Sequence, residues 1–459
     1  MEDMDYDIII LGGGIAGCSI AYELSKYNFN IAVIERDSDI IDDISEVNAS
    51  IIYDGSEAKE DTTALLEKEG IKLIKEACQK FYVRCKNVGL LRIATNDKEA
   101  KKIDYMYELA QDRKVEDVAI IEPNKIDKID KALVNANIKK ALYSKNVSVL
   151  NPYELAIAYG EVAADNGVNF RFDEEVINIE RLNKGFNVTT NRKKFNCKVV
   201  IDTIYREEKD TVSNKWLTYL MIDNNVDYEF NSIVQYKIND EISIYNIPAV
   251  DDINIIGIKS NHKLDRDEAI EYCKNIIRDI NEKNIINIFN EEYKDTMIID
   301  YKNISSGYIK ISGTNYSKMT LTPAFSKIIS ENIAKNLNAK KKKNFEDKRR
   351  ELYRFKRMSD EEINDIIKVE PRYGNIVCVC NRVSEGEIID CIRRPLGARS
   401  IEGIRKRTGA GLGCCYGSYC SRKIIKILAS ELNIKPTEVV QDNKNSKMWI
   451  SRIKEFDEV

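Results

Sequence analysis

The order of apolar and polar positions predicts that the chain opens with a strand, a helix and a second strand. Asp7–Leu11 is a short, largely apolar run, as expected of a buried strand, and Gly12–Gly17 follows as a turn. Cys18–Tyr27 has the composition of a helix, and Ile31–Glu35 is again apolar. This order is typical of the start of a parallel sheet, so we expect an α/β fold.

Later segments alternate between helical and strand-like periodicity. A helical pattern is found over Thr63–Lys80, Lys98–Arg113 and Asn151–Asn166, whereas strand-like segments follow one another through residues 186–258. A strand and a helix within residues 309–336 indicate a return to the first sheet. We therefore expect a domain of mixed α/β (α+β) class with a β-rich subdomain beside it.

The bulk composition describes a globular protein. The chain has 459 residues, enough for two or three domains, with 43% apolar and 32% charged residues. A net charge of -4 gives no overall attraction to nucleic acid, so no nucleic-acid partner is expected. The apolar stretch Ile8–Tyr22 contains a Gly-Gly-Gly turn and follows acidic residues, so we expect neither an integral membrane segment nor a signal peptide, and we expect a cytoplasmic protein.

Three glycines between the first strand and the first helix form a nucleotide-binding pattern. In Gly12-x-Gly14-x-x-Gly17, the missing side chains allow a tight turn and the approach of a diphosphate to the helix N-terminus. Glu35 ends the second strand about 20 residues later, where a carboxylate accepts hydrogen bonds from ribose hydroxyls. The pattern predicts a Rossmann-like dinucleotide site and leaves FAD and NAD both open.

The cysteines fall into two groups. The scattered ones are expected to be core residues: Cys18, Cys78, Cys85, Cys197 and Cys273. Near the C-terminus, two close pairs have the spacing of ligands: Cys378, Cys380, Cys415 and Cys420. Four thiolates suit a [2Fe–2S] cluster, with zinc as the rival. Cys391 and Cys414 are expected to be bystanders, although Cys414 could replace Cys415 as a ligand.

The residues between the two cysteine pairs predict a small helical domain. Ser384 and Glu387 form a capping box for a helix that ends before Pro395, and the N-terminus of a later helix near Cys420 would lower the pKa of that thiol. A cluster with four thiolates is negative and needs nearby cations. Six basic residues would compensate this charge or simply face solvent: Arg393, Arg394, Arg399, Arg405, Lys406 and Arg407.

The predicted cluster favours FAD over NAD. A flavin can split a hydride into single electrons for an iron–sulfur centre, whereas nicotinamide does not do so readily. The glycine pattern also lies at the start of the chain, as in flavoproteins of this fold.

Several segments resemble one known family. Pro371–Gly374, Ser384–Glu387, Arg393–Arg399 and Thr408–Cys420 are similar to the BFD-like [2Fe–2S] domain at the C-terminus of anaerobic glycerol-3-phosphate dehydrogenase large subunits. The glycine turn, Asn48–Gly55 and residues 141–155 resemble the FAD-dependent oxidoreductase domain of that family, which has a DAO-like fold. The FAD site that this resemblance implies comprises Gly12, Gly13, Gly14, Ile15, Ala16, Gly17, Glu35, Arg36, Asn48, Ser50 and Val176.

The resemblance also implies a division into domains. We expect a FAD-dependent oxidoreductase domain over 1–337, with a β-rich substrate-type subdomain over about 80–145 and 205–300, a charged linker over 338–370, a BFD-like domain over 371–435 and a tail over 436–459. Asn338–Arg357 is dense in lysine and arginine, and we expect it to be solvated rather than to bind lipid or a partner.

The chain departs from the family pattern near the expected flavin. Relatives usually carry a histidine where this chain has Tyr53, an Asn-Ala-Ala-Gly turn where it has Asp202–Tyr205, and a glycine-containing loop where it has Tyr316–Met319. Tyr53 and the single histidine, His262, are the candidates for a catalytic role, and a solvated loop position is the simpler interpretation of His262.

Two functions fit these patterns. As an enzyme, the chain would oxidise a small hydroxy acid, polyol phosphate or amine with FAD and pass electrons through the [2Fe–2S] cluster to an acceptor protein or subunit. As a non-catalytic subunit, it would keep both cofactors for electron transfer or assembly without oxidising a substrate. A zinc or iron–sulfur interaction protein without flavin is a third reading. Family members work with further subunits, so the resemblance implies a hetero-oligomer.

Overall fold

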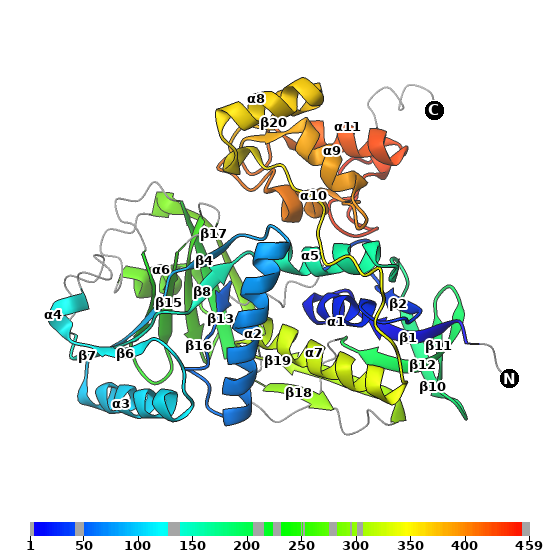
Figure 1. Ribbon diagram of the computed structural model, residues 1–459. Coiled ribbons are helices and arrows are strands. Elements are labelled where there is room, and N and C mark those ends of the chain that lie inside the picture. The colour runs from blue at the N-terminus through cyan, green and yellow to red at the C-terminus, as the bar shows by residue number, and fades with distance from the viewer. Residues whose placement is uncertain are drawn as a thin grey trace.

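A mostly parallel sheet organises the N-terminal part of the computed structural model (Figure 1). Its order is β10-β11-β12-β1-β2-β9, with β19 beside β12 and β18 beside β19. The strands are β1 (Tyr6–Leu11), β2 (Ile31–Ile34), β9 (Asn169–Arg171), β10 (Val176–Arg181), β11 (Phe186–Thr190), β12 (Lys194–Asp202), β18 (Thr296–Asp300) and β19 (Tyr308–Thr314). The structure describes residues 4–41, 50–126, 138–204, 215–223, 231–248, 250, 253–274, 282–293, 296–300 and 306–451.

One face of this sheet is covered by three helices, which are α1 (Ile15–Ser25), α5 (Pro152–Asp165) and α7 (Lys318–Asn336). Ile8 of the sheet, Leu24 of α1 and Leu155 of α5 belong to the core between the two layers. The predicted βαβ start is confirmed. Helix α1 begins earlier than predicted, because the Cys18 amide donates to the Gly14 carbonyl and so brings the last glycine of the pattern into the first helical turn.

A second sheet forms the β-rich subdomain, in the order β17-β13-β16-β15-β14-β5-β7-β6. Its strands are β5 (Leu90–Ala94), β6 (Val118–Ile121), β7 (Lys140–Ser144), β13 (Lys215–Asp223), β14 (Ile233–Lys237), β15 (Ser243–Ile247), β16 (Ile253–Ser260) and β17 (Ile285–Tyr293). Helices α3 (Asp97–Asp112) and α6 (Arg266–Lys274) pack on this sheet, and the short α4 (Pro123–Ile126) follows β6. Two separate stretches of the chain therefore build one sheet.

Helix α2 (Asp61–Lys80) and a small sheet link the two larger sheets. The small sheet pairs β3 (Ile51–Ile52) and β4 (Cys85–Asn87) with β8 (Ser148–Leu150). Helix α2 packs against α7 at Gly70, where a Cβ would lie 1.8 Å from the Thr320 carbonyl oxygen, so glycine is required there. The Tyr53 amide donates to Thr320 Oγ1 at 3.0 Å, which fixes the start of α7 beside the chain that leaves β3.

The C-terminal domain is small and mostly helical, as predicted. It contains α8 (Asp360–Val369), β20 (Ile376–Cys378), β21 (Val383–Ser384), α9 (Glu385–Arg393), α10 (Ile401–Thr408) and α11 (Ser421–Leu432). The predicted capping box is confirmed, because the Glu387 amide donates to Ser384 Oγ and the Ser384 amide donates to the Glu387 carboxylate. Figure 1 shows this domain seated on the side of the first domain that carries α5. No helix in the described part of the chain is long and apolar enough to cross a membrane.

Part of the segment predicted as a solvated linker packs on the first domain, although charged side chains such as Lys343 and Lys348 are exposed as predicted. Arg349 is only 6% exposed, and its Nε donates to Glu161 at 2.6 Å. Arg394 of the C-terminal domain donates to the same carboxylate at 3.0 Å, and Asp347 accepts from the Tyr22 hydroxyl at 2.6 Å. The prediction is wrong for Arg349, because its buried partner lies far away in the sequence and a lysine- and arginine-rich run gives no sign of it.

Candidate functional site

The glycine turn at the carboxyl end of β1 has the backbone geometry of a diphosphate-binding loop. Gly12 has a φ of +96°, and a Cβ on Gly17 would lie 2.0 Å from the Gly12 carbonyl oxygen, so both positions require glycine. Among the described residues no side chain caps α1 at Gly14, and the first turn of α1 carries no acidic residue. The positive end of the helix is therefore suited to an anion, and the turn fits the diphosphate of FAD.

Glu35 connects this turn to the expected adenosine side. Its carboxylate accepts from the Gly13 amide at 2.6 Å and from the Asp37 amide at 3.0 Å, and burial raises its pKa. The Glu174 amide donates to the Glu35 carbonyl at 2.9 Å, and β10 begins two residues later with Val176. The structure therefore brings the candidates Gly13, Glu35 and Val176 to one edge of the sheet.

The other FAD candidates are less closely placed. Asn48 lies outside the described residues. Arg36 is exposed at the rim of the site, and Ser50 has a φ of 61° just before β3.

Tyr53, the first catalytic candidate, is buried and its ring meets that of Tyr316 edge-on, with centroids 5.0 Å apart. Burial raises the pKa of Tyr53 well above its usual value, so the phenol is protonated at neutral pH and is a poor base.

The segment that begins with Asp202 at the end of β12, which differs from the family pattern, is packed against the glycine turn. Thr203 Oγ1 donates to the Leu11 carbonyl at 2.8 Å, directly before the first glycine. Asp202 is fully buried and accepts from the Tyr308 hydroxyl at 2.9 Å. Both residues therefore stabilise the end of the sheet, so the departure from the family pattern leaves the turn intact.

His262, the second catalytic candidate, is exposed in a bend after β16. Its carbonyl oxygen accepts from Ser260 Oγ at 2.6 Å. Tyr53 is buried whereas His262 is exposed, so the two candidates do not share one buried site.

A buried arginine close to Tyr53 was not predicted from the sequence. Arg92 in β5 is 5% exposed, and its Nε donates to Glu57 Oε1 at 2.7 Å. Tyr53 and Asp54 lie close enough to interact with its charge. An arginine at the centre of the apolar strand Leu90–Ala94 was the available signal, because a charge is rarely buried without a partner or a function.

A buried carboxylate, Glu67 of α2, lies in the same region. In the part of the chain that the structure describes, neither of its oxygens has a partner with hydrogen-bond geometry. Burial raises the pKa of Glu67 to about 7, more than the nearby Ser317 and Tyr316 hydroxyls lower it. The region therefore contains a group that titrates near neutral pH.

The cysteines predicted as cluster ligands lie in two thiol groups. The thiols of Cys378 and Cys420 are in contact, and that of Cys380 contacts both Cys415 and Cys414, with 3.7 Å between the Cys380 and Cys414 sulfurs. Within the described ranges, no three His, Cys, Asp or Glu side chains are grouped as for a single metal ion. Cys415 also acts on the Cys420 thiol, so the four predicted ligands from both segments lie together, and four thiolates fit a [2Fe–2S] cluster.

A glycine-rich loop allows the two cysteine segments to approach each other. Gly411 and Gly417 have φ values of 87° and 80°, and a Cβ on Gly413 would lie 2.3 Å from the Cys380 Cβ. Cys378 and Cys420 are buried, whereas Cys380 and Cys414 are exposed. The candidate centre therefore has one side inside the domain and one side at its surface.

One electrostatic prediction for this domain is wrong, and a second holds only for some of its residues. The pKa of Cys420 is raised, to about 11, because burial and the Cys378 thiol outweigh the effect of the start of α11. The predicted compensating cations are partly used elsewhere, since Arg393 pairs with Glu431, Arg394 with Glu161 and Arg407 with Asp39. Arg405 does lie against the cysteine loop, 2.9 Å from the place of a Cβ on Gly411.

The C-terminal domain docks on the loop that follows β2. Both terminal nitrogens of Arg407 donate to the Asp39 carboxylate at 2.6 Å, and both side chains are buried. Lys406 donates to the Ile41 carbonyl at 2.8 Å, and the Ile41 amide donates to the Gly13 carbonyl at 3.2 Å. One short loop therefore joins the glycine turn to helix α10.

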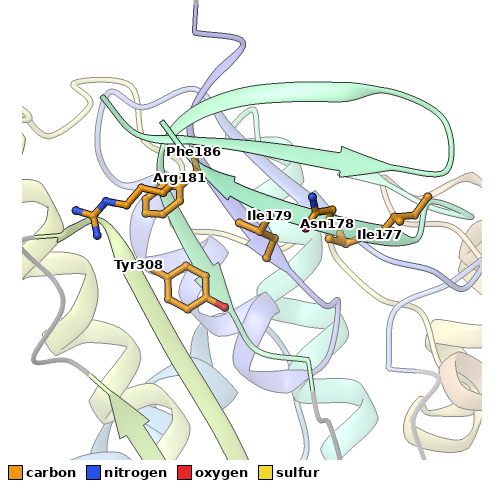
Figure 2. Close-up of a pocket in the computed structure, with 7 residues that line it drawn as sticks. Ile177, Asn178, Ile179, Arg181, Phe186 and Tyr308 are labelled. Carbon is orange, nitrogen blue, oxygen red and sulfur yellow. The ribbon is translucent and has the colours of Figure 1, made fainter. Parts of the chain in front are cut away.

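A surface groove lies on the other face of the first sheet (Figure 2). Phe186 and Tyr308 line it and pack with Ile9 and Leu11, whereas the neighbouring strand residues point toward the three helices. The exposed Ile177 forms its outer wall. This face lies away from Tyr53, and we assign no cofactor to it.

Both sites have counterparts in known proteins. Residues 7–203 match the family model of the FAD dependent oxidoreductases, and residues 376–430 match that of the BFD-like [2Fe-2S] binding domain. The glycerol 3-phosphate dehydrogenase of Caloramator mitchellensis is 31% identical over 96% of this chain and 97% of its own length. The glycerol 3-phosphate oxidase of Mycoplasma pneumoniae is 25% identical over 43% of this chain and 53% of its own length. The FAD-bound, dithionite-reduced L-alpha-glycerophosphate oxidase of M. pneumoniae has a similar fold, with a TM-score of 0.64 and 20% identity over 75% of this chain and 98% of that chain.

The fold and the two sites define a FAD-dependent oxidoreductase with a C-terminal [2Fe–2S] domain. Within this class, the chain belongs to the glycerol 3-phosphate dehydrogenase family, because the similarity to the C. mitchellensis protein spans nearly the full length of both chains. The predicted family, the α/β (α+β) fold class and both cofactors, FAD and the [2Fe–2S] cluster, are thereby confirmed. The domain boundaries and the individual ligand residues stay predictions.

Proposed function

We propose that this chain oxidises a small hydroxy acid, polyol phosphate or amine, and that glycerol 3-phosphate is the first substrate to test. When bound, FAD accepts a hydride from the substrate and the cluster accepts single electrons. The name of the C. mitchellensis relative supports the choice of substrate, because 97% of that protein is covered. The electrons then pass to an acceptor protein or subunit, so we also propose a hetero-oligomer.

The observation that carries the proposal is the loop shared by the two cofactor sites. Asp39 of this loop binds Arg407 of the cluster domain, and Ile41 of the same loop is hydrogen-bonded to Gly13. A fixed contact between the two sites supports electron passage within one chain. The exposed thiols of Cys380 and Cys414 support an exit for electrons at the surface.

The cysteines support a location in the cytoplasm. None of those that the structure describes is in a disulfide, including the half-buried Cys85 outside the cluster domain. Cysteines in this number without a disulfide fit a reducing compartment.

A second function, that of a non-catalytic electron-transfer or assembly subunit, is supported by Tyr53. This residue stands where relatives usually have a histidine, and its protonated phenol donates a hydrogen bond but does not accept a proton readily. Substrate oxidation needs an acceptor for the proton of the substrate hydroxyl or ammonium group. A chain without such a base would keep both cofactors and lack the first reaction.

An anaerobic substrate panel separates the two functions. The holoprotein is mixed with glycerol 3-phosphate, 2-hydroxy acids and small amines, and the flavin absorbance is recorded. We expect glycerol 3-phosphate, or one of the other compounds, to reduce the flavin and so to lower its visible absorbance. Bleaching by dithionite alone, with no response to any compound of the panel, would contradict substrate oxidation and favour the non-catalytic function.

A further inference from the structure

We infer that Arg92 binds the oxyanion of the substrate, either a carboxylate or a phosphate, where the β-rich sheet faces the flavin domain. The inference rests on the proposed function and deepens it, because it names the chemical class of the substrate. An acid or a phosphate ester would bind, and an uncharged polyol would not.

The register of the β-rich sheet directs Arg92 toward the flavin domain. Leu90 and Ile233 are paired across β5 and β14, and both pack in the apolar cluster around Tyr53. Arg92 follows Leu90 by two residues and therefore lies on the same face of the sheet. Gln235 is its direct partner on β14 and shares this face.

The guanidinium of Arg92 is buried, and two of its three nitrogens have no hydrogen-bond partner among the described residues. Its Nε is bound to Glu57 at 2.7 Å, and the side chain is nine-tenths buried. The other two nitrogens are Nη1 and Nη2. Two adjacent donor groups of this kind match the two oxygens of a carboxylate or phosphate, and leaving them unpaired inside the protein is costly.

The groups around Arg92 match the rest of a small substrate. Gln235 donates to the Tyr245 hydroxyl at 2.8 Å, and its buried Oε1 has no partner in the described chain. The Asp54 carboxylate accepts from Ser56 Oγ at 2.6 Å through Oδ1, while its buried Oδ2 has no described partner. These two acceptors suit a hydroxyl or ammonium group next to the oxyanion.

The topology also places Arg92 on the side of the first domain where the flavin half of FAD is expected. Glu35 at the end of β2 takes the adenosine ribose, so the flavin half extends to the other side of β1, where β12 and β19 end. Tyr316 follows β19, and its ring lies against Tyr53. The residues around Tyr53 therefore connect the end of β19, where the flavin is expected, with the strand that carries Arg92.

Three compounds with the same carbon chain test this inference: glycerol 3-phosphate, glycerate and glycerol. Their binding to the oxidised holoprotein is followed by flavin difference spectra, and inorganic phosphate and acetate serve as unreactive probes in calorimetry. We expect phosphate or acetate to bind and glycerol not to bind. The stronger of the two anions identifies the oxyanion as a phosphate or a carboxylate.

The variant Arg92→Met should weaken binding of that anion about 10- to 100-fold and raise KM with little change in kcat, because the oxyanion is held equally before and during the reaction. Arg92→Lys should restore part of the affinity. Glu57→Gln removes the carboxylate that competes for Arg92 and should tighten anion binding, whereas a purely structural Arg92 predicts no change. This second variant tests the inference even if Arg92→Met does not fold.

Unchanged anion affinity in a folded Arg92→Met or in Glu57→Gln would overturn the inference, as would a wild-type protein that binds neither anion. If the chain does not oxidise a substrate at all, so that the proposed function fails, the results differ from these. In that case no compound reduces the flavin, while anion binding still depends on Arg92.

Discussion

Asp39 and Arg407 form a buried two-point ion pair between the flavin domain and the cluster domain, with both N–O distances at 2.6 Å. The two residues lie far apart in the sequence, and the pair joins the loop after β2 to helix α10. Because the same loop is bonded to the glycine turn, the ion pair sets the position of the cluster domain relative to the FAD site.

The variant Asp39→Asn should disrupt this interface. It leaves the Arg407 guanidinium buried without a counter-charge, and the expected loss of stability is roughly 3 kcal/mol. Cluster reduction after flavin reduction should slow as well. Thermal unfolding and rapid-mixing absorbance measure the two effects.

Glu431→Gln is the matched control for Asp39→Asn. Glu431 pairs with Arg393 at 2.6 Å, but the Arg393 side chain is 57% exposed, so the expected cost is below about 1 kcal/mol. Equal effects of the two variants would contradict a special role of the buried pair.

The choice between Cys414 and Cys415 as a ligand can be tested directly. The family pattern assigns Cys415, so Cys415→Ser should lose the cluster absorbance and Cys414→Ser should retain it, with FAD bound in both variants. Iron content and visible spectra of anaerobically purified protein are the measurement. A cluster that survives in Cys415→Ser and is lost in Cys414→Ser would reverse the assignment.

The glycine turn predicts a selective loss of FAD. A Cβ on Gly17 would lie 2.0 Å from the Gly12 carbonyl oxygen, so Gly17→Ala should displace the turn and lower FAD content at least about tenfold. The cluster should remain bound. Gly374→Ala is the control, because its Cβ would meet only Ile367 at an ordinary 3.5 Å, and full FAD content in Gly17→Ala would refute the assignment.

Glu67 should make the stability of the protein dependent on pH. Folding raises its pKa from 4.5 to about 7, so the fold favours the protonated form and loses stability as the pH rises through 7. At pH 8, Glu67→Gln should therefore be more stable than the wild type by up to roughly 3 kcal/mol in the free energy of unfolding and should unfold at a higher temperature. At pH 4 it should show no such advantage. The same difference at both pH values would contradict the buried titration.

Local patterns in the sequence predicted the parts of both sites that depend on backbone shape. The glycine turn, the capping box of Ser384 and the paired cysteines each depend on residues close together in the chain, and glycine or thiol chemistry restricts what can stand there. Contacts between distant segments could not be predicted in this way. Arg349 appeared solvated because its partner, Glu161, lies on α5, far away in the sequence.

The substrate side shows the same limit. Arg92 is visible in the sequence as a charge in an apolar strand, but only the pairing of β5 with β14 brings it to the face of Tyr53. The raised pKa of Cys420 is a further case, because the start of a helix was evident and the burial beside Cys378 was not.

Electron transfer from the flavin to the cluster is tested most directly by electron paramagnetic resonance of freeze-quenched samples. The anaerobic holoprotein is mixed with a compound that bleaches its flavin, or with glycerol 3-phosphate first, and samples are frozen over time. The account predicts that a reduced [2Fe–2S] signal grows after the flavin is reduced, and that Cys378→Ser lacks this signal while its flavin still bleaches. A flavin that is reduced while a fully loaded cluster stays oxidised would contradict it.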